Sequence, residues 1–172
     1  RAGVLLHPTS LPGPGGLGDL GPAARTFASQ LGEAGCSIWQ TLPVHPVGPG
    51  NSPYSPRSAF AGEPMLLSLA DLAEEGLVPR SIAKRRAGAP GRADWRAARQ
   101  IRREALAIAW ERFRSDGGER DGRFTRFRRR ESAWLEDWCR LGVRRGETPE
   151  RLAFEQFLFD RQWKALRVHA RS

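Results

Sequence analysis

The chain has 172 residues, of which 40% are hydrophobic, and its formal net charge is +9. A chain of this length can form one globular domain with a hydrophobic core. No apolar run approaches a membrane span, and the N-terminus lacks a charged segment followed by an apolar one. Neither a membrane helix nor a secretory signal is visible, so we expect a cytoplasmic protein.

The positive charge comes almost wholly from arginine, because Lys84 and Lys164 are the only lysines. Arginine together with abundant Ala and Gly more often reflects compositional bias than a nucleic-acid site, although the charge would permit phosphate binding. Cys36 and Cys139 are far apart in sequence and match no metal spacing. We therefore expect buried, reduced thiols and no metal site.

The first forty residues predict a βαβ unit. The apolar run at residues 4–6 indicates a first buried strand, which ends at His7 and Pro8. A helix is predicted to begin at Pro22 and to end at Gly35, because proline is favoured at the first helical position. Residues 38–42, rich in β-branched and aromatic side chains, predict a second strand buried on both faces. The two strands should be parallel and joined by a right-handed crossover.

Residues 43–64 form a long segment without helical or alternating periodicity. Its many prolines and glycines restrict the backbone, which predicts an ordered loop. Long ordered loops at strand ends are usually functional. The sequence therefore places its candidate site directly after the second strand.

The remainder of the chain is predicted to be mainly helical. Asp94 is the expected cap of the first long helix, and the stripe that begins at Phe124 indicates the next. The predicted elements are a brief extended piece at 65–69, a short helix at 70–75, an exposed basic connection at 80–92, and helices at 94–114, at 124–141 and from 148 to near the C-terminus. Two parallel strands alone do not make a stable domain, so this pattern predicts an incomplete fold.

Four motifs occur in order in the first 64 residues: LLHPTSLPG at 5–13, GDLGP at 18–22, WQTLPVHPVGPGNSPY at 39–54 and SAFAGEP at 58–64. With them the chain resembles the 4-alpha-glucanotransferases called amylomaltases or disproportionating enzymes, family 77 of the glycoside hydrolases. A weaker resemblance continues through residues 128–137 and 157–166. It covers nearly the whole chain, but only about the first third of such an enzyme.

The resemblance implies an α/β fold, an incomplete (β/α)8 TIM barrel that contains the first two parallel strands and an all-helical insertion after strand two. Residues 1–64 would hold the first two barrel strands, the helix between them and the substrate loop. Residues 65–147 would form the mainly helical insertion, and residues 148–172 the barrel helix that precedes strand three.

The implied function is that of an N-terminal fragment of a 4-alpha-glucanotransferase. Such an enzyme transfers α-1,4-glucan segments between maltodextrins by a retaining double displacement, and it requires neither cofactor nor metal. Retention needs two carboxylates about 5 Å apart, and the family places its catalytic carboxylates on later strands. Here the strand-end loops offer Asp19, interpreted as a loop or helix cap, and Glu63, interpreted as solvated. We therefore assign no catalytic residue and expect the fragment alone to be inactive without the rest of the barrel.

The expected substrate-binding residues are Tyr54, Ser52 and Asn51. Aromatic faces stack on glucose while hydroxyls and amides bond to its rim, and Tyr54 matches the family tyrosine that lines the pocket at the cleavage point. Alternatively, Tyr54 packs beneath the loop as part of the core. The chain departs from the family at Pro49, where many members carry a second stacking tyrosine, and at Glu63, where many carry asparagine.

Other candidates have a simpler structural interpretation. His7 is expected to make structural hydrogen bonds beneath the loop rather than to act as a base, and Gln40 could bind sugar at a strand end. The tryptophans are expected in the core: Trp39, Trp95, Trp110, Trp134, Trp138 and Trp163. A different class of function also remains open, a small basic module that binds nucleic acid through residues 126–130 and 80–92, with strong salt dependence.

Overall fold

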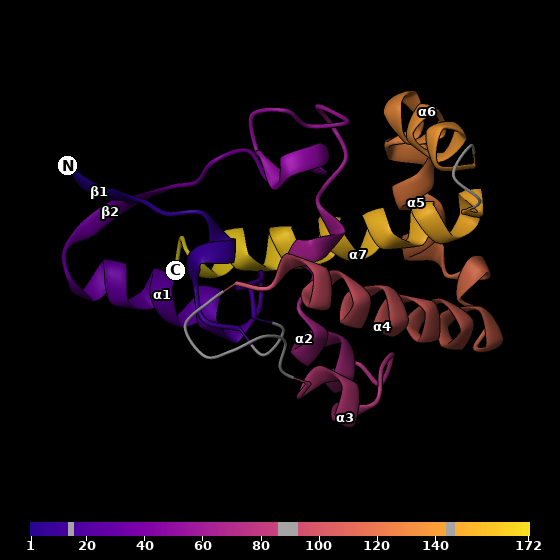
Figure 1. Ribbon diagram of the computed structural model, residues 1–172, viewed down its shortest axis with the longest axis horizontal. Coiled ribbons are helices and arrows are strands. Elements are labelled where there is room, and N and C mark those ends of the chain that lie inside the picture. The colour runs from indigo at the N-terminus through magenta and orange to yellow at the C-terminus, as the bar shows by residue number, and fades with distance from the viewer. Residues whose placement is uncertain (14–15, 86–92, 144–146) are drawn as a thin grey trace.

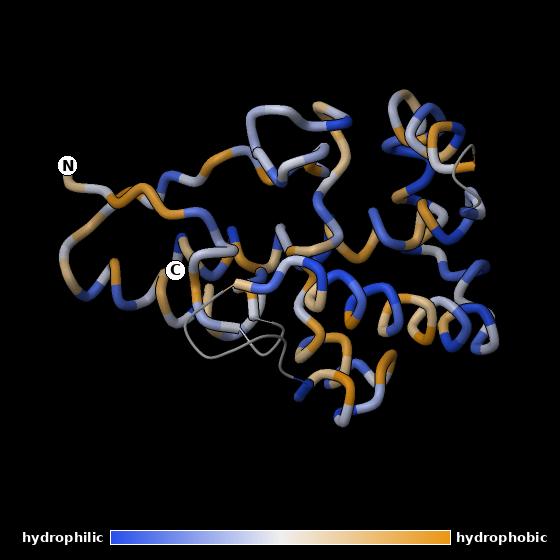
Figure 2. The backbone as a smooth tube through the Cα atoms, in the orientation of Figure 1, coloured by the Kyte–Doolittle hydropathy of each residue, from blue (hydrophilic) through white to orange (hydrophobic). Residues whose placement is uncertain are grey.

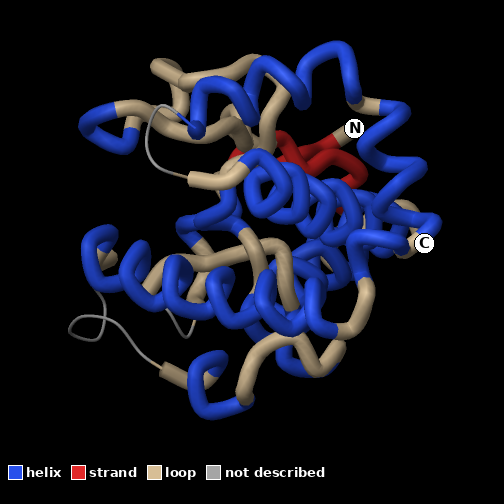
Figure 3. The backbone as a smooth tube through the Cα atoms, turned by 90° about the vertical axis from the view of Figure 1, so that its right-hand side faces the viewer, coloured by secondary structure: helices blue, strands red, loops and turns tan. Residues whose placement is uncertain are grey.

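The computed structural model describes residues 1–13, 16–85, 93–143 and 147–172 (Figure 1). Helices make up most of the described chain, and the sheet has two strands (Figure 3). The strands are β1 (Ala2–Leu5) and β2 (Cys36–Gln40). The helices are α1 (Pro22–Glu33), α2 (Leu69–Glu74), α3 (Arg80–Ala83), α4 (Trp95–Ser115), α5 (Gly122–Arg130), α6 (Ser132–Val143) and α7 (Pro149–His169).

Strands β1 and β2 are parallel, with Gly3 opposite Ile38 and Leu5 opposite Gln40, as the sequence predicts. Helix α1 connects them and begins at Pro22, again as predicted. The expectations of a buried first strand and of a second strand buried on both faces are wrong, because Leu5 of β1 and Ile38 of β2 are 55% and 47% exposed. Figure 2 shows hydrophobic stretches along the two strands. A two-stranded sheet packs one face on α1, and the described part of the chain leaves the other face largely open.

Trp39 fastens the covered face of β2 to its neighbours. Its indole ring meets the ring of Phe27 in α1 edge to face, with 5.0 Å between the centroids. Its Nε1 donates a hydrogen bond of 2.8 Å to the carbonyl of Leu6, just beyond β1. This half-buried tryptophan is therefore part of the core, as expected.

Helix α7 is the central element of the fold (Figure 1). It contacts α1 near one end, α5 and α6 near the other, and α4 along its side. Aromatic rings fill the junction with α4 and α5: Phe113 stacks on Phe154 at 4.5 Å, and Phe124 lies 5.4 Å from Phe157. The broad apolar arc predicted for this helix reflects these contacts on several sides. The main hydrophobic core joins residues from α1 and the loop before it, the middle helices and α7.

The predicted single helix over residues 124–141 is interrupted. Glu131 has φ −99° and ψ 9°, which ends α5 and separates it from α6. Its carboxylate accepts a hydrogen bond of 2.7 Å from the indole of Trp134 and one of 2.6 Å from Arg130. Both α5 and α6 contact α7, and the break allows each half of the apolar stripe to reach that helix. Tertiary packing thus overrides the helical periodicity.

Helix α4 begins where the sequence predicts, because the Asp94 carboxylate accepts the backbone N–H of Ala97 at 2.9 Å. The exposed connection expected at 80–92 is partly wrong. Residues 80–83 form the short helix α3, in which Ile82 and Ala83 are buried. Residues 86–92 lie outside the described part of the chain.

Two glutamine side chains of α7 bind the backbone of the segment that follows the long loop. Gln156 accepts the N–H of Gly62 at 2.7 Å and donates to the carbonyl of the same residue at 3.0 Å. Gln162 does the same for Ser68, at 2.8 and 3.2 Å. Each glutamine amide therefore pairs with both the N–H and the C=O of one residue, as the backbone of a neighbouring strand would. A Cβ on Gly62 would lie 2.0 Å from the Phe159 ring, so only glycine allows this approach.

These contacts also explain why the extended piece predicted at 65–69 is wrong. The two glutamines are six positions apart, which is about 9 Å along a helix axis. Six extended residues would span about 20 Å and overshoot. The segment is instead shortened by a 3-10 turn at Pro64–Leu66, in which Leu67 donates to the carbonyl of Pro64.

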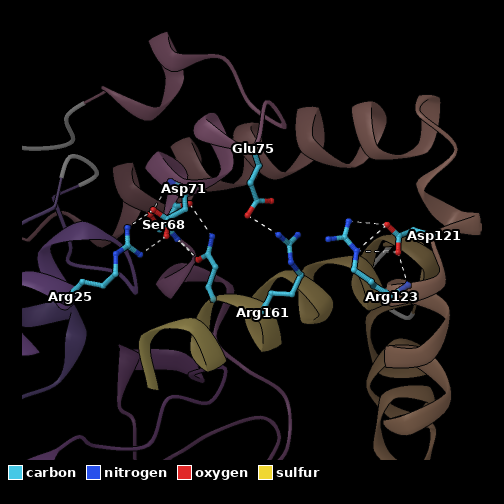
Figure 4. A network of polar contacts seen from close by, with 8 residues as sticks. Arg25, Ser68, Asp71, Glu75, Asp121, Arg123 and Arg161 are labelled. Carbon is cyan, nitrogen blue, oxygen red and sulfur yellow. Dashed lines mark hydrogen bonds and ion pairs between the residues drawn. The ribbon is translucent and has the colours of Figure 1, made fainter. Parts of the chain in front are cut away.

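Ion pairs on the surface connect the short helix α2 to α1 and to α7 (Figure 4). Arg25 of α1 binds both carboxylate oxygens of Asp71 at 2.9 Å, and Arg161 of α7 binds Glu75 at 2.8 Å. Asp71 also donates its backbone N–H to the hydroxyl of Ser68, which caps α2. No helix within the described ranges is long and apolar enough to cross a membrane.

We predict that Gln156→Ala lowers the free energy of unfolding by about 2–4 kcal/mol, because it leaves the buried N–H and C=O of Gly62 without partners. Urea unfolding followed by tryptophan fluorescence measures this. Gln100→Ala is the matched control, since Gln100 lies exposed on α4, and it should cost less than about 0.5 kcal/mol. Equal midpoints for the two variants would show that the Gln156 amide is dispensable.

Candidate functional site

The loop after β2 folds back on itself as a narrow hairpin. Val47 and Pro56 form an antiparallel bridge. Beside it, Gly48 donates to the carbonyl of Ser55 at 3.1 Å, and Arg57 donates to the carbonyl of Pro46 at 2.8 Å. These backbone bonds fix the ends of residues 49–54, so the tip, which begins with a 3-10 turn at Pro49–Asn51, has a defined position.

Glu63 holds the base of this hairpin. Its backbone N–H donates to the carbonyl of Val44 at 2.9 Å. Its carboxylate accepts the N–H of Val47 at 2.8 Å through Oε2 and the N–H of Met65 at 3.0 Å through Oε1. The expectation of a solvated Glu63 is wrong, because the residue is buried and both oxygens are bonded. Glu63 is therefore a structural residue. The expectation rested on the neighbouring Pro64, which carries no information about these contacts.

The tip carries the three residues predicted to contact sugar. Asn51 follows Gly50 in a left-handed conformation, with φ values of 57° and 82°, a region that asparagine tolerates better than most residues. The hydroxyl of Ser52 accepts the N–H of Tyr54 at 3.3 Å. The Tyr54 side chain is 72% exposed, so it does not pack beneath the loop as the alternative interpretation required.

Tyr54 lines an open cleft of about 530 Å³ at the carboxyl end of β2. The opposite wall comes from the residues that directly follow this strand. The lining residues are Thr41, Leu42, Pro43, Val44, His45, Pro53, Tyr54, Pro56 and Ala59. His45 is held in place, because its Nδ1 donates to the carbonyl of Ala61 at 2.9 Å. Apolar walls with an aromatic ring and a few polar groups suit the apolar face and hydroxyl rim of a glucose unit.

Asp19, the other carboxylate near a strand end, is also engaged. It accepts the N–H of Gly21 at 2.9 Å, which agrees with the expected loop role, and lies 3.6 Å from the guanidinium of Arg102. Gly21 itself is the N-cap of α1, which has no side-chain cap hydrogen bond. Burial raises the pKa of Asp19 to about 6, and the positive charge of Arg102 opposes this shift. Asp19 and Glu63 thus both serve backbone hydrogen bonds rather than projecting into the cleft beside Tyr54.

Glu155 is a perturbed carboxylate that the sequence did not single out. It lies buried on α7, and one oxygen accepts a hydrogen bond of 3.1 Å from Arg151. Burial raises its pKa to about 7, and Arg151 only partly offsets the cost of burying the charge. The sequence contained a hint of this contact, because Arg151 precedes Glu155 by four residues and residues at that spacing are neighbours on a helix.

The remaining candidates take structural roles. His7 caps the turn Pro8–Ser10: its Nδ1 accepts the Thr9 N–H at 3.4 Å, and burial lowers its pKa, so it is neutral at pH 7. Gln40 is exposed at the end of β2, where its carbonyl accepts the N–H of Leu6. Both cysteines are free; the Cys139 thiol is buried, which raises its pKa to about 11, whereas Cys36 is half-buried. The described residues contain no cluster of three or more ligands for a metal ion.

Two arginines of α4 near the site were not predicted. Arg102 is buried, and its alignment with the buried alanines 98, 105 and 109 was an available signal. Arg99 donates a hydrogen bond to the side-chain oxygen of Asn51. Nothing in sequence distinguishes Arg99 from the exposed Arg96 and Arg103, because only the folded loop brings Asn51 to it.

A parallel βαβ unit with a cleft beyond the carboxyl end of its strand is typical of α/β enzymes, in which the loops after the strands carry the active site. The model of glycoside hydrolase family 77, described as 4-alpha-glucanotransferase, matches residues 6–151. The chain belongs to this family, as its motifs predict.

Individual relatives agree with this assignment. The 4-alpha-glucanotransferase of Thermus thermophilus is 39% identical, over 98% of this chain and 39% of the relative. The chloroplastic/amyloplastic 4-alpha-glucanotransferase of Solanum tuberosum is 36% identical, over 100% of this chain and 36% of the relative. The amylomaltase of Streptococcus agalactiae in complex with acarbose superposes with a TM-score of 0.88 and 26% identity, over 99% of this chain and 41% of that structure. The chain thus spans about two fifths of these relatives.

We predict that Glu155→Gln changes the pH dependence of stability. The folded-state pKa of about 7 lies above the ordinary value of 4.5, so the folded protein binds the extra proton between these values. The free energy of unfolding should therefore fall as the pH rises from about 4.5 to about 7. The variant lacks this loss and should be more stable than the wild type at pH 8 by roughly 3 kcal/mol.

Urea midpoints at half-unit pH intervals measure this difference. Asp19 titrates in both proteins, so subtraction of the two curves isolates Glu155. Glu150→Gln removes an exposed carboxylate from the same helix, and its curve should run parallel to that of the wild type. A variant that is less stable than the wild type at pH 8 would mean that the bond to Arg151 outweighs the burial of charge.

Proposed function

We propose that this chain is the N-terminal part of a 4-alpha-glucanotransferase that moves α-1,4-glucan segments between maltodextrins by a retaining double displacement. The observation that carries the proposal is the exposed Tyr54 ring on a braced hairpin, facing a cleft at the carboxyl end of β2. Membership of glycoside hydrolase family 77 supports it. In this function Tyr54, Ser52 and Asn51 form one wall of the sugar site, and the catalytic carboxylates come from elsewhere in the barrel.

The same proposal includes the fold. Strands β1 and β2 would be the first two strands of a (β/α)8 barrel, residues 65–147 a helical insertion, and α7 the helix before strand three. A groove of about 380 Å³ supports this, because it lies along β2 between α1 and the C-terminal end of α7. Ile38 of β2 is exposed there, which leaves an edge and a face for a further strand to cover. A cytoplasmic location completes the proposal.

The arginine-rich segment gives the nucleic-acid alternative little support. Arg130 bonds to both Glu131 and Asp160, at 2.6 and 2.9 Å. Arg128 lies over the ring of Phe124, with 5.8 Å to its centroid. Intramolecular contacts thus occupy these two side chains, and we propose no second function.

Tyr54 is the only tyrosine, so a chain labelled with fluorotyrosine gives one fluorine NMR resonance from the proposed site. We predict that titration with acarbose shifts this resonance in a saturable way, because the inhibitor would cover an exposed ring. Cellotriose, which has β-linked glucose, and a single-stranded oligonucleotide are the controls and should leave the resonance in place. A shift with the oligonucleotide but not with acarbose would contradict the proposal.

Tyr54→Ala should weaken acarbose binding by about 10-fold, as expected for about 1.4 kcal/mol of stacking. This variant contains no tyrosine for the fluorine probe, so the backbone amide resonances of Asn51 and Ser52 report its binding. The urea midpoint reports its stability, which should stay within about 0.5 kcal/mol. Phe60→Ala is the matched control, because Phe60 is a 69% exposed aromatic residue of the same loop outside the cleft lining. A lowered midpoint with unchanged binding would make Tyr54 part of the scaffold.

The 172-residue chain should not disproportionate maltotriose. Retaining transfer needs two carboxylates about 5 Å apart across the bond that breaks, and Asp19 and Glu63 are both engaged with backbone groups. Chromatography of a maltotriose incubation for glucose and longer maltodextrins tests this. Turnover by the pure chain would contradict the prediction and assign a catalytic role to Asp19 or Glu63.

A further inference from the structure

The first two turns of α4 contact both loops that follow the strands. Leu17, in the loop after β1, and Met65, at the end of the loop after β2, are buried in one small apolar cluster with Ala98 of α4. Trp95, at the start of the same helix, packs against this cluster. One stretch of helix thus forms a common support for two loops that are far apart in sequence.

Arg102 fixes this part of α4 on the loop after β1. Its guanidinium is buried, with 2% of the side chain exposed, and lies 3.6 Å from the carboxylate of Asp19. The same Nη2 donates to the carbonyl of Leu17 at 3.4 Å. Because a buried charge that loses its partner is costly, this pair resists displacement of α4 from the loop.

Arg99 precedes Arg102 by three residues and therefore lies about one turn earlier on the helix. Its guanidinium donates to the side-chain oxygen of Asn51, the residue that follows Gly50 in the left-handed region. The backbone direction set at Asn51 determines where Ser52, Pro53 and Tyr54 lead. The hydrogen bond therefore acts at the point of the tip where the chain turns toward the cleft.

We propose that Arg99 is a positioning residue for Tyr54. It holds the Asn51 side chain on α4 and thereby sets the orientation of the tyrosine ring at the cleft, while Arg102 keeps α4 itself in place. This assigns the oxygen of Asn51 to an internal contact and leaves its amide N–H groups and the Ser52 hydroxyl for a ligand. The role of Arg99 in glucan binding rests on the proposed function, whereas its hydrogen bond to Asn51 does not depend on that function.

The test uses the whole chain labelled with fluorotyrosine, without any sugar. Arg99→Gln should shift or broaden the single Tyr54 resonance. It should also speed exchange of the backbone amide hydrogens of Asn51, Ser52, Tyr54 and Ser55 by about 3- to 10-fold, as expected for the loss of one hydrogen bond. Arg99→Lys, which can still donate to Asn51, should restore most of the wild-type spectrum. The urea midpoint should not move, because Arg99 is exposed, so general destabilisation cannot produce the effect.

Two further variants complete the design. Arg103→Gln removes the same charge from an exposed position of the same helix and should leave the Tyr54 resonance and the exchange rates unchanged. Asn51→Gly removes the side chain while tolerating the left-handed φ of 57° at this position. It should reproduce the Arg99→Gln spectrum, and combining the two should add nothing, since both remove one contact. Identical spectra for Arg99→Gln and the wild type, or equal effects of Arg99→Gln and Arg103→Gln, would overturn the proposal.

Acarbose titration of the same proteins separates this inference from the proposed function. If Arg99 positions Tyr54 for sugar, Arg99→Gln should weaken acarbose binding by about 3- to 10-fold, the factor expected for one lost hydrogen bond, and Arg99→Lys should restore it. A sugar-free spectral change with no acarbose binding by any protein would uphold the positioning role and count against the sugar site. If Arg99→Gln changes neither acarbose binding nor the sugar-free spectrum, the sugar site would be upheld and the positioning role of Arg99 would be wrong.

Discussion

The arrangement of the chain depends on two glutamine side chains of α7 that hydrogen-bond to the backbone of a loop segment in the way that a paired β-strand would. Gln156 and Gln162 each satisfy both polar groups of one peptide position, at Gly62 and Ser68. A buried backbone group without a partner is costly, so these bonds connect α7 to the end of the β2 loop and to the start of α2. The hairpin that carries Tyr54 and the helices after it are both positioned from this segment.

The loop after β2 has little regular secondary structure, yet it holds the surface around Tyr54 in a fixed position. Prolines reduce the freedom of the unfolded loop, and Glu63 and the Val47–Pro56 bridge close its base. Tyr54 can therefore be exposed and still have a set position, which lowers the entropy lost when a ligand covers it. Glu63 suits this role, because its two carboxylate oxygens bind two backbone amides at once.

Features governed by local sequence were predictable. Pro22 and Asp94 start helices for reasons contained within one turn, and the order of strand, helix and strand sufficed for parallel pairing. The motifs led to the family and to the loop that bears Tyr54. What failed depends on partners far along the chain: the burial of Glu63, the turn at Pro64–Leu66, the break at Glu131 and the contact between Arg99 and Asn51. The exposure of β2 was missed because strand composition reports the surroundings of a complete sheet, and two strands do not provide them.

The equal spacing of the glutamines and their targets has an evolutionary consequence. Residues 62 and 68 are as far apart in sequence as residues 156 and 162, so the loop segment and the helix are matched in length. One residue inserted between the glutamines would turn the second about 100° around the helix axis and away from its partner. One residue inserted in the loop segment would move Ser68 past its glutamine. Point substitutions in these two stretches are therefore compatible with both amide pairs, whereas an insertion or deletion in either stretch alone would break one of them.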